Sequence, residues 1–191
     1  MSDEIGTRLE QRFIMSYQKF PSNRIMTLSK TMFGKGLTDS DRMKYLRLFA
    51  YGSVITTYIL IVIGGYVSAS GSGLACPDWP TCNGQVIPVL TGPVIVEYTH
   101  RLFALVVALF VTATFVLALF RYRNERGILA LSGASFFLLL AQIFLGMVTV
   151  KSELNATVTA AHLGLASAVF AMVLGNALFV RSRRTEILRL S

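Results

Sequence analysis

The chain has 191 residues, of which 53% are hydrophobic and only 15% are charged, and its formal net charge is +8. This balance excludes an ordinary soluble globular domain and indicates an integral membrane protein. No nucleic acid is needed to explain the positive charge, because membrane topology and the anionic headgroups of a lipid bilayer account for it.

Residues 1–43 differ from the rest of the chain because their charges are mixed and their apolar runs are short. Pro21, Gly34 and Gly36 interrupt any long helix in this segment. No apolar core of the length found in a signal peptide follows the early charges. We therefore expect a cytoplasmic N-terminal extension, to which the sequence assigns no chemistry.

Four apolar segments follow, and each is long enough for a helix that crosses a bilayer, which needs about 20 residues. They cover residues of about 46–68, 94–121, 127–150 and 155–180. The sequence therefore predicts an all-α integral membrane protein. We expect a four-transmembrane-helix bundle over residues 44–184, followed by a cytoplasmic tail at residues 185–191.

Lysine and arginine residues indicate the orientation of these helices, because short cytoplasmic loops retain them. They cluster before the first segment, between the second and third, and after the fourth: Arg42, Lys44, Arg47, Arg121, Arg123, Arg126, Arg181, Arg183, Arg184 and Arg189. Residues 68–94 contain none, and the connection after the third segment has only Lys151. We expect both termini to be cytoplasmic in a multi-pass protein of the cell membrane.

The first extracytoplasmic loop contains the run GLACPDWPTCNG, residues 73–84, which holds both cysteines and the only tryptophan of the chain. Disulfides persist on this side of the membrane and no other cysteine competes, so we expect Cys76 and Cys82 to close the loop. Two free thiols are an alternative, and a metal site is a weaker one because further ligands are missing nearby. Trp79 would serve as an interfacial anchor or as a flat lid.

The only two histidines, His100 and His162, both fall in membrane helices. They lie 20 and 18 residues from the cytoplasmic helix ends near Phe120 and Val180, which corresponds to about 30 and 27 Å. Ionisable residues in a membrane are functional candidates, and two imidazoles at one depth in a four-helix bundle suit the axial ligation of haem iron. The alternative is a helix cap for one histidine and an interhelical hydrogen bond for the other.

Glu97 precedes His100 by three residues and Arg101 by four, so the three side chains can be neighbours on one helix surface. A carboxylate beside a haem could accept a proton or stabilise a developing cation, which makes Glu97 a candidate catalytic residue. Arg101 would then be free to meet a haem propionate. An ion pair between Glu97 and Arg101 is the alternative.

Four motifs carry a resemblance to a known family. They are GSGLACPDWPTCNGQVIP in the first loop, EYTHR at the start of the second segment, QIFLGMVTVKSELN at the end of the third, and AHLGLA in the fourth. Together, from about Tyr51 to Val180, they resemble the haem A synthase family of bacteria and mitochondria. Members of that family usually have eight helices in two similar halves, and this chain resembles the N-terminal half.

The resemblance implies an oxidoreductase that converts the C8 methyl group of haem O to a formyl group. The reaction would proceed by successive hydroxylations and loss of water, and would give haem A for terminal oxidases. Glu97 would be the catalytic carboxylate, with His100 and His162 as the axial ligands of the haem iron. Cys76 and Cys82 would form a redox-sensitive pair over a site near the extracytoplasmic face. Haem b would be the cofactor and haem O the substrate.

The second half of the family, which holds a separate haem b that passes electrons, has no counterpart in this sequence. The resemblance therefore implies a homo-oligomer, a dimer or larger, with a haem O synthase or a terminal oxidase as a further partner. At residues 68–70 the run Ser-Ala-Ser replaces an arginine and a threonine common in the family, so a positive group expected near the outer haem edge is absent.

Two other functions stay open at this point. One is a non-catalytic, haem b-binding electron carrier or accessory subunit of a respiratory complex. The other is a thiol oxidoreductase that uses the loop cysteines in exchange.

Overall fold

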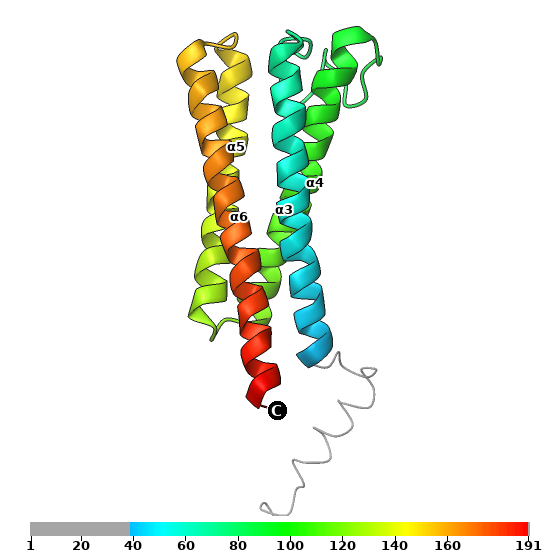
Figure 1. Ribbon diagram of the computed structural model, residues 1–191. Coiled ribbons are helices and arrows are strands. Elements are labelled where there is room, and N and C mark those ends of the chain that lie inside the picture. The colour runs from blue at the N-terminus through cyan, green and yellow to red at the C-terminus, as the bar shows by residue number, and fades with distance from the viewer. Residues whose placement is uncertain (1–38, 191) are drawn as a thin grey trace, which may run out of the picture. The chain divides into compact units, whose positions relative to one another are not determined.

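The computed structural model describes residues 39–190, with side chains for residues 43–183. Within this range the chain folds into four α-helices, which are α3 (Asp39–Ala69), α4 (Gly92–Arg121), α5 (Arg126–Lys151) and α6 (Ala156–Leu190) (Figure 1). The apolar segments expected from the sequence are thus helical. Most of the expected N-terminal extension, residues 1–43, lies outside the described residues.

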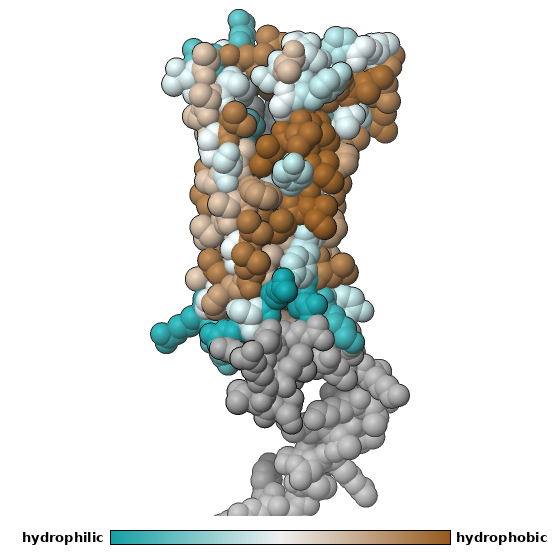
Figure 2. All heavy atoms as spheres, viewed as in Figure 1, coloured by the Kyte–Doolittle hydropathy of each residue, from teal (hydrophilic) through white to brown (hydrophobic). Residues whose placement is uncertain are grey.

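All four helices are long and apolar enough to cross a membrane. The candidate spans are Met43–Ala69, Gly92–Arg121, Arg126–Lys151 and Ala156–Arg183. Figure 2 shows hydrophobic side chains gathered over the middle of the face in view, with more hydrophilic residues toward both ends of the helices. The prediction of an all-α, multi-pass membrane protein is confirmed.

Successive helices run in opposite directions, so the α3–α4 and α5–α6 connections lie at one end of the bundle and the α4–α5 connection at the other (Figure 1). Helix α6 begins after Asn155, whose side-chain oxygen accepts a hydrogen bond from the Thr157 N–H at 3.0 Å, as is typical of an N-cap. A Cβ atom at Gly73 would lie 3.1 Å from Cδ1 of Leu154. The two connections at this end of the bundle are therefore in contact.

Two clusters of buried hydrophobic side chains hold the helices together. One is formed by α4, α5 and α6 and contains Val107, Val111, Leu139, Val169 and Val173. The other takes one residue from every helix: Leu46, Ala118, Ile128 and Val180. The rings of Phe49 on α3 and Phe110 on α4 add a contact with centroids 5.9 Å apart. In a lipid environment, van der Waals packing of this kind stabilises the association of helices.

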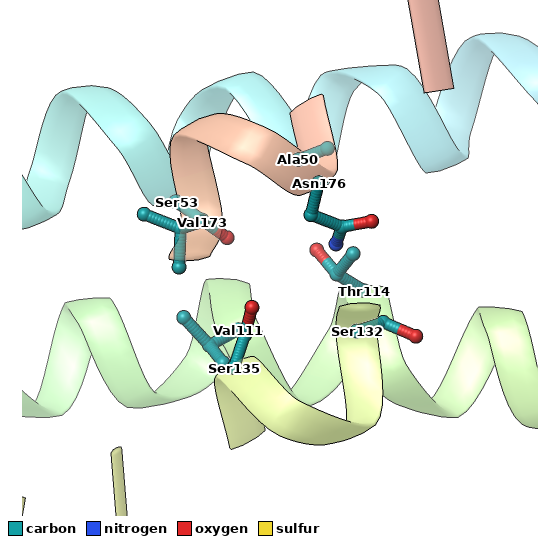
Figure 3. Close-up of a pocket in the computed structure, with 8 residues that line it drawn as sticks. All are labelled: Ala50, Ser53, Val111, Thr114, Ser132, Ser135, Val173 and Asn176. Atoms are coloured by element: carbon teal, nitrogen blue, oxygen red, sulfur yellow. The ribbon is translucent and has the colours of Figure 1, made fainter. Parts of the chain in front are cut away.

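A small polar cavity lies inside the bundle, and all four helices contribute to it (Figure 3). Its lining residues are Ala50, Ser53, Val111, Thr114, Ser132, Ser135, Val173 and Asn176. Each hydroxyl group donates to a backbone carbonyl of its own helix. The Asn176 Oδ1 atom is buried and has no hydrogen-bond partner among the described residues. The space inside the cavity is too narrow for a water molecule.

Candidate functional site

The cap loop, residues 70–91, joins α3 to α4 and is closed by a disulfide between Cys76 and Cys82, whose Cα atoms are 4.5 Å apart. The two cysteines are 0% and 1% exposed. Cys82 and Gln85 exchange two backbone hydrogen bonds of 2.9 and 3.1 Å just beyond the crosslink. The disulfide predicted from the sequence is confirmed, and its sulfur atoms are shielded from solvent.

The Asp78 carboxylate organises the tight turn in this loop. It accepts hydrogen bonds from the Thr81 hydroxyl, from the Asn83 N–H at 2.6 Å and from the Gly84 N–H at 2.9 Å. Asn83 and Gly84 have φ angles of 53° and 73°, in the left-handed region that asparagine and glycine tolerate. These hydrogen bonds, above all the one from Thr81, lower the pKa of Asp78 from 3.8 to about 2. The ionised carboxylate therefore stabilises the turn.

Arg101 attaches the cap loop to α4. Its guanidinium donates to the backbone carbonyls of Cys76 at 2.6 Å, Asp78 at 2.7 Å and Thr81 at 2.6 Å. It also donates to Oε1 of Glu97 at 2.5 Å, which forms an ion pair within α4. A planar guanidinium with five donors suits such a set of acceptors. The ion pair considered as an alternative is thus present, while a contact between Arg101 and a propionate stays a prediction.

Glu97 lies at the junction between α4 and the cap loop. Its side chain is buried, and its Oε2 atom accepts a hydrogen bond of 2.8 Å from the backbone N–H of Cys76. Because Arg101 binds the other carboxylate oxygen, Glu97 is held from the loop side and from its own helix. The sequence predicts the proximity of Glu97, His100 and Arg101, but the hydrogen bond to Cys76 depends on how the loop folds back.

The His100 ring on α4 packs against Gly64 of α3. A Cβ atom built at Gly64 would lie 3.0 Å from Cε1 and 3.5 Å from Nδ1 of His100. The Nδ1 atom is buried and has no hydrogen-bond partner among the described residues. Cε1, the carbon between the two ring nitrogens, is the His100 atom nearest to Gly64.

The His162 ring on α6 packs in the same way against Gly146 of α5, where a Cβ atom would lie 3.1 Å from its Cε1. Gln142, one turn before this glycine, donates to the His162 carbonyl at 3.1 Å, and its side-chain nitrogen lies 3.4 Å from Nε2 of His162. Within the described residues, Nδ1 of His162 and Oε1 of Gln142 are buried without a partner.

Two imidazoles can complete the coordination of a metal ion when a cofactor supplies its other ligands. The part of the chain that the structure describes contains no group of three or more His, Cys, Asp or Glu side chains arranged to hold a metal ion. Two histidine ligands suit haem iron, because the porphyrin supplies four nitrogen donors. Two histidines on α4 and α6, with no group of three metal-ligating side chains in the described residues, therefore fit the predicted haem.

Sequence reasoning missed the two glycines that face the histidines. Gln142 and Gly146 are four residues apart and share a face of α5, and this spacing is a signal that the sequence contains. Gly64 belongs to a Gly-Gly pair in an apolar helix, and nothing in the sequence distinguishes it from Gly65. Trp79 is 38% exposed in the cap loop, and its role as an anchor or lid stays a prediction.

Fold and site together define a four-helix membrane protein with a disulfide-closed cap loop and two histidines whose Nδ1 atoms are buried without partners in the described structure. The profile of the COX15-CtaA family, described as cytochrome oxidase assembly protein, matches residues 47–93 and 90–190. The chain belongs to this family, as its motifs predict.

The chain is similar to haem A synthases from several bacteria. It is 33% identical over 149 residues to that of Alkalihalophilus pseudofirmus, which covers 76% of this chain and 50% of the relative. It is 35% identical over 136 residues to that of Bacillus pumilus, with 67% and 43% covered. For Geobacillus kaustophilus the identity is 29% over 165 residues, with 85% and 51% covered. The chain therefore spans about half the length of these relatives.

Proposed function

We propose that the chain acts as a haem A synthase, which oxidises the C8 methyl group of haem O to a formyl group and provides haem A for terminal oxidases. The observation that carries this proposal is the position of Glu97, a buried carboxylate fixed by the disulfide loop and placed one turn before His100. Membership of the COX15-CtaA family and similarity to haem A synthases support it.

In this proposal His100 and His162 hold the haem from two helices of the bundle. When bound, the haem iron supplies the redox chemistry, with haem b as cofactor and haem O as substrate. The protein contributes the two imidazole ligands and the apolar surroundings that exclude water. The placement of the only two histidines of the sequence on α4 and α6, in a chain similar to haem A synthases, supports this assignment.

Glu97 is proposed to accept a proton that the methyl group releases during its oxidation, or to stabilise a developing cation. The carboxylate accepts one hydrogen bond on each oxygen, from Cys76 and from Arg101, and retains further lone pairs for a proton. Because both oxygens are held, the group keeps one orientation without help from the substrate. Fixed orientation of this kind is what general base catalysis requires.

We place both termini in the cytoplasm and the site near the extracytoplasmic face. The basic residues that support this orientation lie at the start of α3, in the α4–α5 connection and in α6 near its end. The cap loop contains no lysine or arginine. Its disulfide also suits an oxidising compartment.

The chain spans about half the length of the relatives it matches. Identical four-helix units can pair about a two-fold axis, which is the usual symmetry of homodimers. We therefore propose a homo-oligomer that receives haem O from a haem O synthase and delivers haem A to a terminal oxidase.

A second candidate is a haem b-binding electron carrier without turnover, because histidines on α4 and α6 could ligate haem iron whether or not Glu97 acts on the haem. Thiol exchange is less well supported, because reactive cysteines are accessible to their partners and both sulfur-bearing residues here are buried.

The test is to purify the protein from a host that also makes haem O and to identify the extracted haem by mass. We expect haem A or its hydroxylated precursor with the wild type, and haem O with Glu97→Gln. Glu125→Gln, a change at an exposed carboxylate in the α4–α5 connection, is the control and should behave as the wild type. If the wild type holds only haem b or unmodified haem O, the carrier is the better account.

A further inference from the structure

Gly64 and Gly146 each face the edge of one of the two imidazole rings. A Cβ atom at Gly64 would lie 3.0, 3.5 and 3.9 Å from Cε1, Nδ1 and Nε2 of His100. At Gly146 the corresponding distances to His162 are 3.1, 3.8 and 3.8 Å. Carbon atoms in favourable contact are about 3.5–4.0 Å apart, so an alanine methyl group at either position would require the ring to move by a few tenths of an ångström.

Close contact with a ring is not unique to these two glycines, since a Cβ atom at Gly52 or Gly127 would lie even closer to the ring of Phe110 or Phe179. A Cβ atom at Gly65, the next residue of α3, would have no atom within 4 Å, and the same holds for Gly164, two residues from His162 on α6. Gly64 and Gly146 differ from Gly52 and Gly127 in that the ring beside them is an imidazole, which can bind a metal ion. The ring edge is what occupies the space at both.

The arrangement occurs once in each helical hairpin. In α3–α4 and again in α5–α6, the first helix contributes the glycine and the second the histidine. In the second hairpin Gln142 adds a hydrogen bond to the His162 carbonyl, which fixes the backbone that carries the ring. Each imidazole is thus backed by the main chain of its neighbouring helix.

We propose that Gly64 and Gly146 are positioning residues that hold the His100 and His162 rings for ligation of one haem iron, an inference that rests on the proposed haem binding. Direct contact with helix backbone restricts where each ring can lie before the ligand arrives. Binding then costs less reorganisation, which is how preorganised sites gain affinity. An alanine at either position would move the ring away from its helix.

The contact itself is tested by a double-mutant cycle on thermal unfolding of the haem-free protein in detergent, with Gly64→Ala, His100→Ala and the pair. We expect Gly64→Ala to lower the melting temperature by about 3 °C or more, since overpacking is destabilising. The same change should have little effect once the ring is removed by His100→Ala. Gly65→Ala is the control. An equal loss with and without the ring would overturn the inference.

The effect of these glycines on haem binding is tested by titrating the protein with ferric haem b and recording absorption and electron paramagnetic resonance spectra. We expect Gly64→Ala and Gly146→Ala to bind about tenfold more weakly than the wild type, or to shift the low-spin signal, because the ring must move. Gly65→Ala and Gly164→Ala should match the wild type. If all four variants match it, the glycines do not position the rings. If the wild type binds no haem while the cycle shows coupling, the haem-binding proposal fails and the positioning role fails with it.

Discussion

The backbone N–H of Cys76 donates a hydrogen bond to Oε2 of Glu97 at 2.8 Å, which links the disulfide loop directly to the candidate catalytic carboxylate. Arg101 forms a second link between the loop and Glu97, because it donates to the other carboxylate oxygen and to three backbone carbonyls of the same loop. A change that loosens the loop should therefore also release Glu97.

Replacing Arg101 with lysine should loosen the cap loop while keeping the charge. A single ammonium group cannot reproduce the planar set of donors that reaches the carbonyls of Cys76, Asp78 and Thr81. We expect amide hydrogen exchange in residues 74–85 to become faster by one to two orders of magnitude, equivalent to about 2 kcal/mol. Arg123→Lys, on the exposed α4–α5 connection, is the control. Unchanged exchange in Arg101→Lys would contradict the role given to this side chain.

The buried disulfide should resist reagents as long as the protein is folded. Because Cys76 and Cys82 are inaccessible, a phosphine reductant followed by a maleimide should label them only after unfolding. Removing the crosslink by Cys76→Ser with Cys82→Ser should destabilise the protein by about 2 kcal/mol, as expected for a short closed loop. Thermal unfolding of the two proteins in detergent measures the difference. Fast labelling of the native protein would show that the loop opens and would favour a thiol-exchange role.

Acid should weaken the cap loop through Asp78. Its pKa is lowered from 3.8 to about 2 in the folded loop, so the carboxylate contributes stability that is fully present above about pH 4. That contribution is lost as the pH falls toward 2, where the folded group takes up a proton. Between these values the protection of the loop amides should decrease in the wild type. It should change less in Asp78→Asn, and an identical pH dependence in both would exclude this carboxylate as the cause.

Replacing Asn176 inside the bundle with an apolar residue should not destabilise the protein. Among the described residues, the Asn176 Oδ1 atom has no hydrogen-bond partner, and it borders a cavity too narrow for water, so its burial costs free energy. We expect Asn176→Leu, which has the same number of side-chain heavy atoms and the same branching at Cγ, to unfold at the same or a higher temperature than the wild type. A loss of more than about 1 kcal/mol would show that this side chain links the helices.

Much of the architecture follows from the sequence because its signals are local. Apolar runs of membrane length predict the four helices, and two cysteines without competitors predict the disulfide. The spacing of Glu97, His100 and Arg101 predicts that they are neighbours, since three and four residues are one helical turn.

What the sequence did not predict depends on the rotation of helices and the path of the loop. Which carbonyls Arg101 meets is decided by the turn around Asp78, and residue types do not encode the direction of a carbonyl. Gly64 differs from Gly65 only in the side of α3 on which it lies. That side is set by packing between helices far apart in the sequence.

The measurement that tests the central claim most directly is the electron paramagnetic resonance spectrum of the protein loaded with ferric haem b, for the wild type, His100→Ala and His162→Ala. Two imidazole ligands give a low-spin ferric signal, and loss of either should produce a high-spin signal or loss of haem. We predict low-spin haem in the wild type and its loss in both variants. A low-spin signal that survives either substitution would show that the two histidines do not share one haem iron.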